Sequence, residues 1–322
     1  MAVGFKKISR ALTAGSLLFG GALTASVLVA TQTASATTTT VVSVPGGVTV
    51  EGVSSDGQYV LYDVGCTSGE CVHWLDTQSG TDILIGLDEN LRARLSPDGQ
   101  HAVWEEFWGG AFVDGDPSGL GLSQGTVYEW TPNGASGGTY TQVSPTATAY
   151  PGGGLLSEFA FPSISGDGSV IAYAYRLATQ STCCSSGTTI VNQVTNATIN
   201  IPESDTWFDP TAMSADGSVI GRPTATGEEI DEYSTADGSV IRSLLATRQL
   251  ALYDLSSNGL YGVGYAYGDP ATSGLAYYDF SNNVVQPIPN SGDGGTGCDN
   301  LSSIISVSDD GGTVAFGAPS PE

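Results

Sequence analysis

Ser96-Pro97-Asp98-Gly99 is one of six copies of a four-residue motif, Ser-x-Asp/Asn-Gly, that recurs along the chain. The Asp or Asn positions of successive copies are 42, 69, 49, 42 and 52 residues apart. A short apolar run follows each copy, as Ala102-Val103-Trp104 follows the second. The other copies begin at Ser54, Ser165, Ser214, Ser256 and Ser308. Repetition at this period, built on strands, indicates repeated supersecondary units.

Each repeat reads as four strands. The first strand ends at the Ser of the motif. Asp-Gly then forms a tight turn in which Gly takes a positive φ, and the apolar run that follows is the second strand. The third and fourth strands are short β-branched and aromatic runs bounded by Gly, Asn, Asp and Pro. The third are predicted at 72–75, 127–130, 190–193, 230–233 and 276–279, and the fourth at 82–85, 140–143, 198–201, 240–243 and 284–287. Six such units predict an all-β fold, a six-bladed β-propeller.

The first 36 residues have the pattern of a secretory signal peptide. Basic residues at positions 6, 7 and 10 precede an apolar segment, 11–30, and a small-residue cleavage site, Ala34-Ser35-Ala36. The apolar segment approaches the length of a membrane span, but its Gly, Ser, Thr and Ala content favours cleavage. We therefore expect a secreted, extracellular protein without a stable membrane anchor, in which residues 37–322 form a single propeller domain.

The sixth repeat has two clear strands, at 304–307 and 313–316, before the sequence stops at Glu322. Near the start, Val41–Val44 and the following Pro resemble the fourth strand of the third repeat, Ile199–Pro202. We predict that Val41–Val44 closes the last blade as its outer strand, which leaves no open sheet edge. This closure still leaves the last blade without a third strand. Either that blade has three strands or the sequence ends early.

The motif resembles the Ser-Pro-Asp-Gly turn of TolB-type and WD-repeat-like (WD40-like, PD40) propeller repeats. The match is complete at Ser96–Gly99 and partial in the other copies, and it covers nearly all of residues 37–322. The resemblance implies the propeller fold. TolB carries an α/β domain before its propeller and prolyl-oligopeptidase-like enzymes carry a hydrolase domain, and this sequence shows neither pattern. The resemblance therefore implies neither a partner nor a peptidase activity.

Acidic residues dominate the sequence after the signal peptide. Six of the nine basic residues lie there, all of them Arg, against 33 acidic residues, which gives a net charge of −27. A chain of this charge repels phosphate backbones and anionic membrane surfaces, which excludes nucleic acid as a partner. The acidity reflects either solubility outside the cell or cation binding.

Strand alternation assigns every connection to one of two faces of the ring. The turns after the first and third strands lie on one face, here the turn face. The connections after the second strands and between blades lie on the other, the loop face. Long loops on a rigid scaffold concentrate binding residues, and exposed aromatic residues are candidate anchors. The candidate ligand-binding residues are Phe107, Trp108, Phe112, Tyr150, Trp207 and Phe208. The alternative is that these rings pack beneath their own loops or between blades.

All five cysteines map to the loop face. An exported chain meets an oxidising environment, so Cys66 and Cys71 are predicted to form a local disulfide. Cys183, Cys184 and Cys298 can form a vicinal bridge, a bridge to Cys298 or free thiols, and the sequence does not choose among these.

Calcium is the one cofactor that the sequence suggests. Asp114 and Asp116 alternate as calcium ligands do, but the remaining positions of a calcium loop are missing. A zinc site is weakly supported, because His73 and His101, the two histidines of the chain, fall in predicted strands.

No catalytic residues are recognised, because the sequence has no Gly-x-Ser-x-Gly elbow, no phosphate loop and no His near a candidate nucleophile. The sequence favours a monomeric, secreted binding module for an extracellular protein or glycan, acting through the loop face. The alternative is a metal-assisted enzyme on carbohydrate or phosphoester substrates, with acidic residues at the central channel.

Overall fold

The computed structural model describes residues 4–5, 25–33, 36–44, 48–66, 69–88, 93–107, 125–134, 137–145, 156–178, 185–203, 211–224, 226–267, 274–288, 305–308 and 310–318. Every element in these ranges is a β-strand. Within them, no helix has the length and apolar character that a membrane span requires.

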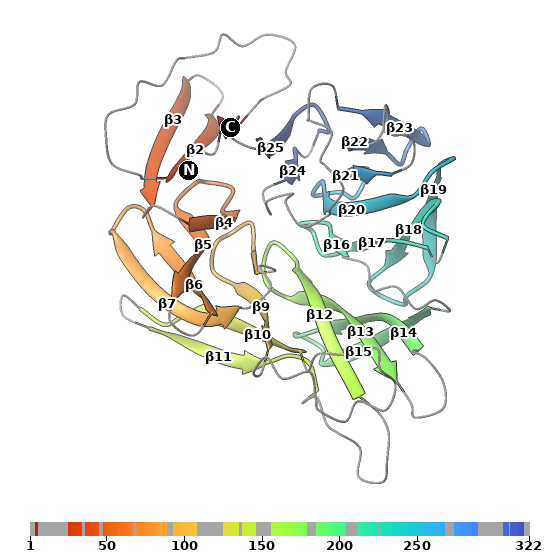
Figure 1. The fold of residues 1–322 in the computed structure, drawn as a ribbon, viewed down its shortest axis with the longest axis horizontal. Helices are drawn as coiled ribbons and strands as arrows, with labels where there is room; N and C mark the ends of the chain where they lie inside the picture. Colours follow the sequence, from red (N-terminus) through yellow and green to blue (C-terminus); the bar gives the residue numbers. More distant parts are fainter. Residues whose placement is uncertain are drawn as a thin grey trace.

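Five four-stranded antiparallel sheets, the blades, lie around a central space (Figure 1). The first contains β4 (Val48–Val53), β5 (Tyr59–Cys66), β6 (Gly69–Asp76) and β7 (Thr81–Asp88). The second contains β8 (Arg94–Leu95), β9 (Ala102–Phe107), β10 (Gly125–Pro132) and β11 (Gly138–Gln142). The third contains β12 (Leu156–Ile164), β13 (Val170–Ala178), β14 (Ser185–Asn192) and β15 (Ala197–Glu203). The fourth contains β16 (Ala212–Met213), β17 (Val219–Pro223), β18 (Glu229–Ser234) and β19 (Val240–Leu245). The fifth contains β20 (Leu250–Leu255), β21 (Tyr261–Ala266), β22 (Gly274–Asp279) and β23 (Val284–Pro287).

The strands of each blade follow one another in space as they do in the sequence. First strands of successive blades contact each other around the centre, from β4 and β8 through β20 and β24. The predicted third and fourth strands coincide with observed strands in these blades, except that 190–193 and 140–143 each extend one residue beyond β14 and β11. The chain is therefore an all-β propeller, as the repeat predicted.

The core lies between blades, because neighbouring blades cover both sides of a sheet. Leu61, Ile85, Trp104 and Trp130 form one such layer between the first and second blades, and each is at most 2% exposed. Further layers join the third to the fourth blade and the fourth to the fifth. Such two-sided burial explains why a second strand such as β21 has an apolar residue or glycine at every position.

A further sheet follows the fifth blade and has the order β1-β25-β24. It contains β24 (Ile305–Val307) and β25 (Val314–Ala318), the two strands predicted around the sixth motif. β1 (Gly4–Phe5) pairs with β25 and occupies the position that a third strand has in the other blades.

Val41–Val44 does not close this sheet in the structure. It belongs to β3 (Ala36–Val44), which pairs with β2 (Ala25–Thr33) in a separate hairpin. The hairpin lies between β25 and β4 in Figure 1, and β2 contacts both β1 and β4. A segment next to Val41–Val44 in sequence competes for the same backbone groups, and pairing with it closes a much shorter loop. The structure thus describes five four-stranded blades, and the count of six stays a prediction.

Candidate functional site

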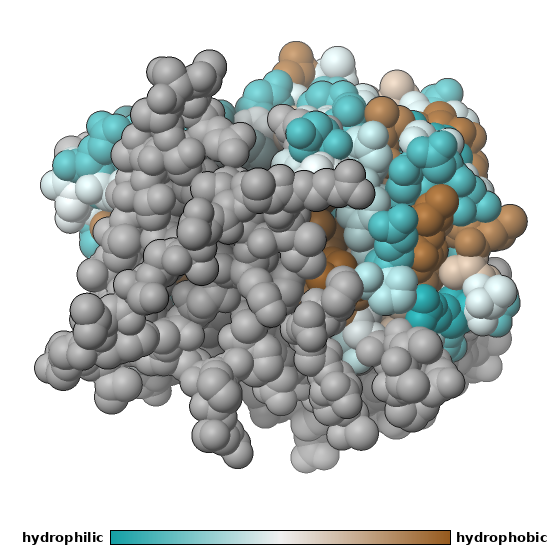
Figure 2. Space-filling model, turned by 90° about the horizontal axis from the view of Figure 1, so that it is seen from above, coloured by the Kyte–Doolittle hydropathy of each residue, from teal (hydrophilic) through white to brown (hydrophobic). Residues whose placement is uncertain are grey.

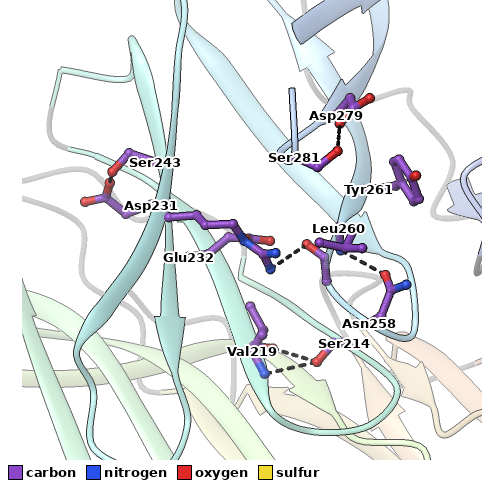
Figure 3. Close-up of polar contacts among 12 residues, drawn as sticks. Ser214, Val219, Asp231, Glu232, Ser243, Asn258, Leu260, Tyr261, Asp279 and Ser281 are labelled. Atoms are coloured by element: carbon purple, nitrogen blue, oxygen red, sulfur yellow. Dashed lines mark hydrogen bonds and ion pairs between the residues drawn. The ribbon is translucent and has the colours of Figure 1, made fainter. Parts of the chain in front are cut away.

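The Ser-x-Asp/Asn-Gly motifs form one hydrogen-bonded turn, repeated in all six copies. In the fourth copy, the Ser214 hydroxyl donates to Asp216 Oδ1 (2.7 Å) and accepts from the Val219 N–H (3.0 Å; Figure 3). Asp216 Oδ1 also accepts from the Ser218 N–H at 2.9 Å. Gly217 has a φ of 70°, and the glycines of the other copies lie between 66° and 74°. The predicted tight turn with a positive-φ glycine is confirmed.

The turns also connect neighbouring blades. Gly99 lies against Tyr59 of the preceding blade so closely that an added Cβ would be 2.1 Å from the ring. Gly168 lies against His101 in the same way. Backbone hydrogen bonds join successive motifs, from Ser55 N to Pro97 O (2.7 Å), Asp98 N to Gly166 O (3.4 Å), Gly166 N to Ala215 O (2.6 Å) and Asp216 N to Ser257 O (3.2 Å). The first five motifs are therefore joined on the turn face by a continuous series of backbone hydrogen bonds.

The carboxylates of the third and sixth motif copies are held ionised. Hydrogen bonds from Ser169 keep the pKa of Asp167 below its usual range, and the Gly312 N–H does the same for Asp310. A carboxylate stabilised as an acceptor is a poor proton donor at neutral pH. The chemistry of these residues is that of turn formation.

The opposite ends of the strands bear the candidate binding loops. Phe107 pairs with Gly125 at the end of β9 and β10 that is far from Ser96. Because the strands alternate in direction, 108–124 and the inter-blade connections at 146–155 and 204–210 leave from this same face. Trp108, Phe112, Tyr150, Trp207, Phe208, Asp114 and Asp116 lie outside the described residues, as does the side chain of Phe107. Their roles in binding ligand or calcium stay predictions.

Three charged residues on first strands were not singled out from the sequence. Glu51 on β4 is 3% exposed, and its Oε2 lies 3.8 Å from Nη1 of Arg94 on β8. Burial raises the pKa of Asp254 on β20 to about 6, against the opposing effects of the Val307 N–H, Ser306 and Arg94. Asp254 Oδ2 accepts from Val307 N at 3.0 Å. These contacts join the first blade to the second and the fifth blade to the last sheet.

Aligning the six motif copies would have revealed these three residues. Each stands two or three positions before the motif Ser, where the other copies have uncharged residues. In the described part of the chain, no three His, Cys, Asp or Glu side chains are grouped as a metal site would need. The metal-assisted alternative therefore gains no support from the described carboxylates and stays a prediction.

The two histidines each contact a carboxylate. His73, on β6 as predicted, has its Nδ1 3.0 Å from Asp82 Oδ1. His101 directly precedes β9, and its Nδ1 lies 2.8 Å from Glu129 Oε1. Glu129 Oε2 also accepts from Gln193 of the third blade at 2.6 Å. The hydrogen bond with Glu129 raises the pKa of His101, and the charges of Asp98 and Asp167 act in the same direction.

We expect the stability that His101 contributes to decline as pH rises. A raised folded pKa means that this contribution is complete below the unfolded value of about 6.5 and is lost as pH passes the folded value. His101→Gln keeps a hydrogen-bond donor without the charge. The variant should therefore unfold at a lower temperature than wild type at pH 6, and the gap should narrow toward pH 9. Thermal unfolding followed by circular dichroism measures this difference in unfolding temperature. A difference that stays constant from pH 6 to pH 9 would show that His101 acts by packing alone.

A buried ion pair lies where the fourth blade meets the fifth. Glu232 on β18 is 0% exposed, and Nε of Arg242 on β19 donates to its Oε2. Arg242 Nη2 also donates to Gly259 O in the fifth motif at 3.2 Å. Figure 3 shows Glu232 pointing toward the turn that contains Asn258. Burial raises the pKa of Glu232 to about 7, although the Arg242 charge opposes this rise.

The predicted Cys66–Cys71 bridge has a compatible backbone. Cys66 pairs with Gly69 and Cys71 with Val64 across β5 and β6, so both cysteines lie on one side of the hairpin as diagonal neighbours. The Cys66 side chain lies outside the described residues, as do Cys183, Cys184 and Cys298. All of these pairings stay predictions.

No protein-family model matches the chain, and no curated protein sequence does. Among solved structures, it is similar to a putative TolB from Agrobacterium tumefaciens, with a TM-score of 0.52 and 16% identity over 88% of this chain and 95% of that one. It is also similar to TolB from Acinetobacter baumannii (TM-score 0.48, 14% identity, 78% of this chain and 57% of that chain). It is also similar to the β-propeller domain of the Trilobed protease from Pyrococcus furiosus, with a TM-score of 0.49 and 9% identity over 78% of this chain and 73% of that chain. The likeness to the putative TolB from Agrobacterium tumefaciens, at 16% identity, establishes the propeller fold alone.

Proposed function

We propose that the chain is a secreted, six-bladed β-propeller that binds an extracellular protein or glycan through its loop face. The observation that carries the proposal is the difference between the two faces. The hydrogen bonds of the described Ser-x-Asp/Asn-Gly turns are made within each turn and to neighbouring turns. The other strand ends lead into the connections that contain Trp108 and Trp207. A rigid frame with long loops at one end is a common design for binding.

The sixth blade is proposed to close after the signal peptide is removed. Residues 1–36 include all of β1 and β2, which are the partners of β25 and β3. Their removal would expose a backbone edge on both β25 and β3. Pairing of Val41–Val44 in the last sheet would satisfy groups on both strands and close the ring.

The test uses protein expressed with residues 1–36 and purified from the medium, with its intact mass showing whether it begins at Thr37. Binding to insoluble cell-wall polysaccharide and to immobilised secreted proteins is measured for wild type and for Trp108→Ala/Trp207→Ala. We expect at least about tenfold weaker binding, because aromatic anchors typically dominate an interface. Tyr140→Ala is the control, since Tyr140 is a 54% exposed ring on β11, away from the loop face.

Equal binding by wild type and the double variant would refute the loop-face assignment. Metal analysis of the purified protein, with and without chelator, addresses the enzyme alternative. Tightly bound metal in stoichiometric amount would favour that alternative over the binding module.

A further inference from the structure

The outer strand of the fourth blade, β19, is an open sheet edge with exposed apolar side chains. It is the last strand in the order β16-β17-β18-β19. Val240, Ile241 and Leu245 are 52%, 46% and 61% exposed. Figure 2 shows hydrophobic residues among hydrophilic ones on the right-hand side of the molecule, where β19 lies in Figure 1. An edge of this kind is a template for pairing with another strand.

Three of the other four described outer strands contain a charged residue or a proline that opposes such pairing. β7 has the exposed carboxylate of Asp82, and β15 and β23 contain Pro202 and Pro287. β11 is polar except for Tyr140. Charged residues and prolines on edge strands prevent the addition of a further strand. The one charged residue of β19, Arg242, is turned inward to Glu232 and Gly259 and gives no such protection.

The backbone direction of β19 identifies the groups that face outward. Ala246 N donates to Glu228 O at 2.8 Å, so this residue faces β18. Leu245 N donates instead to Asn283 Oδ1 at 3.0 Å, so Leu245 faces away from β18. Because the two directions alternate in an antiparallel pair, Ser243 presents its N–H and C=O outward. Asn283 covers one end of the edge and a register shift at Ile241 interrupts the other, which leaves the outward groups of Ser243 for an added strand.

The charged residues around β19 indicate which kind of strand would bind at this edge. Asp231 and Glu229 lie on β18 directly opposite Ser243 and Leu245, and Asp231 Oδ1 accepts from the Ser243 hydroxyl at 2.5 Å. Glu228 and Asp237 are exposed nearby in the sequence. A second copy of this chain, with a formal net charge of −24, would be repelled. Basic side chains on an incoming strand would be attracted to these carboxylates.

We propose that β19 is a docking edge for an extended segment of another protein with alternating apolar and basic side chains. The segment adds to the fourth blade as a fifth strand. Its main-chain groups pair with Ser243, and its apolar side chains cover Ile241 and Leu245. This edge lies at the rim of the ring, so the interaction is separate from ligand binding at the loop face.

The probe is a short fluorescent peptide of alternating Lys and Val, titrated with the purified protein and followed by anisotropy. Wild type should bind it, and Ile241→Lys/Leu245→Lys should bind at least about tenfold more weakly. Leu84→Lys/Val194→Lys is the matched control, because it adds the same charge at positions 52% and 76% exposed on other blades. The control variant should bind as wild type does, and thermal melts should show both variants folded.

Two further peptides test the mode of binding. Methylation of alternate peptide nitrogens removes the donors that strand addition needs, so that peptide should not bind. A peptide of alternating Glu and Val should not bind either. The proposal is overturned if wild type binds no peptide, if the methylated peptide binds equally well, or if the β19 variant binds as tightly as the control. It is also overturned if wild type sediments as a dimer that the β19 variant abolishes, since the occupant is then a second copy.

Discussion

Substituting Gly99 with alanine should lower the free energy of unfolding by about 2–5 kcal/mol. Two costs add together. Gly99 has a φ of 73°, where an L-residue costs about 1–2 kcal/mol. A Cβ there would lie 2.1 Å from Cδ2 of Tyr59 on the preceding blade. Overpacking of this kind costs about 1–3 kcal/mol. Equilibrium unfolding in guanidinium chloride measures the loss.

Gly80→Ala is the matched control. Gly80 has a φ of 72°, but nothing lies within 4 Å of an added Cβ. This variant should show the backbone cost alone, so its difference from Gly99→Ala reports the contact between blades. Adding Tyr59→Ala to Gly99→Ala removes the clash and should make the two substitutions strongly non-additive. Equal losses for Gly99→Ala and Gly80→Ala would contradict the role of the motif glycine in joining blades.

Substituting Arg242 with methionine should destabilise the protein by about 3–5 kcal/mol near pH 8. The variant leaves the Glu232 carboxylate buried at 0% exposure without its guanidinium partner. Near pH 5 the loss should be much smaller, because the carboxyl group can be protonated. Denaturant unfolding at several pH values measures the effect.

The pH dependence follows from the direction of the Glu232 pKa shift. Its folded pKa is raised from 4.5 to about 7, so the stability linked to its protonation is complete below 4.5 and is lost as pH rises through about 7. Loss of the Arg242 charge, which lowers this pKa, moves the folded value further up. Adding Glu232→Gln to Arg242→Met should remove most of the pH dependence. If Arg242→Met lost the same free energy of unfolding at pH 5 and at pH 8, Glu232 would not be the source of the destabilisation.

The strands were predictable because each is a local pattern. Ser-x-Asp-Gly contains the groups of its own turn, and Val72–Leu75 is a short, mostly apolar run beside a turn, so neither needs information from elsewhere in the chain. The two faces of the ring followed from strand alternation. The pairing of Val41–Val44 was not predictable in this way, because β2 and β25 offer it the same backbone groups.

Contacts between blades required the tertiary structure. Glu51 and Arg94 are 43 positions apart, and Asp254 and Val307 are 53 apart. Nothing in either local sequence specifies the partner. The same holds for His101 and Glu129, where the sequence indicated a strand residue and the structure shows a hydrogen bond beneath the third motif.

The propeller, the order of its strands and the structural use of its repeated turn were all predictable from the residues alone. All three follow from short-range patterns that recur at a nearly regular period. How the blades are joined, which carboxylates are buried between them, and which apolar residues are exposed at the edge of β19 emerged from the three-dimensional contacts. Those features depend on the residues that distant repeats bring together, and on whether Arg242 turns outward to guard its strand or inward to Glu232.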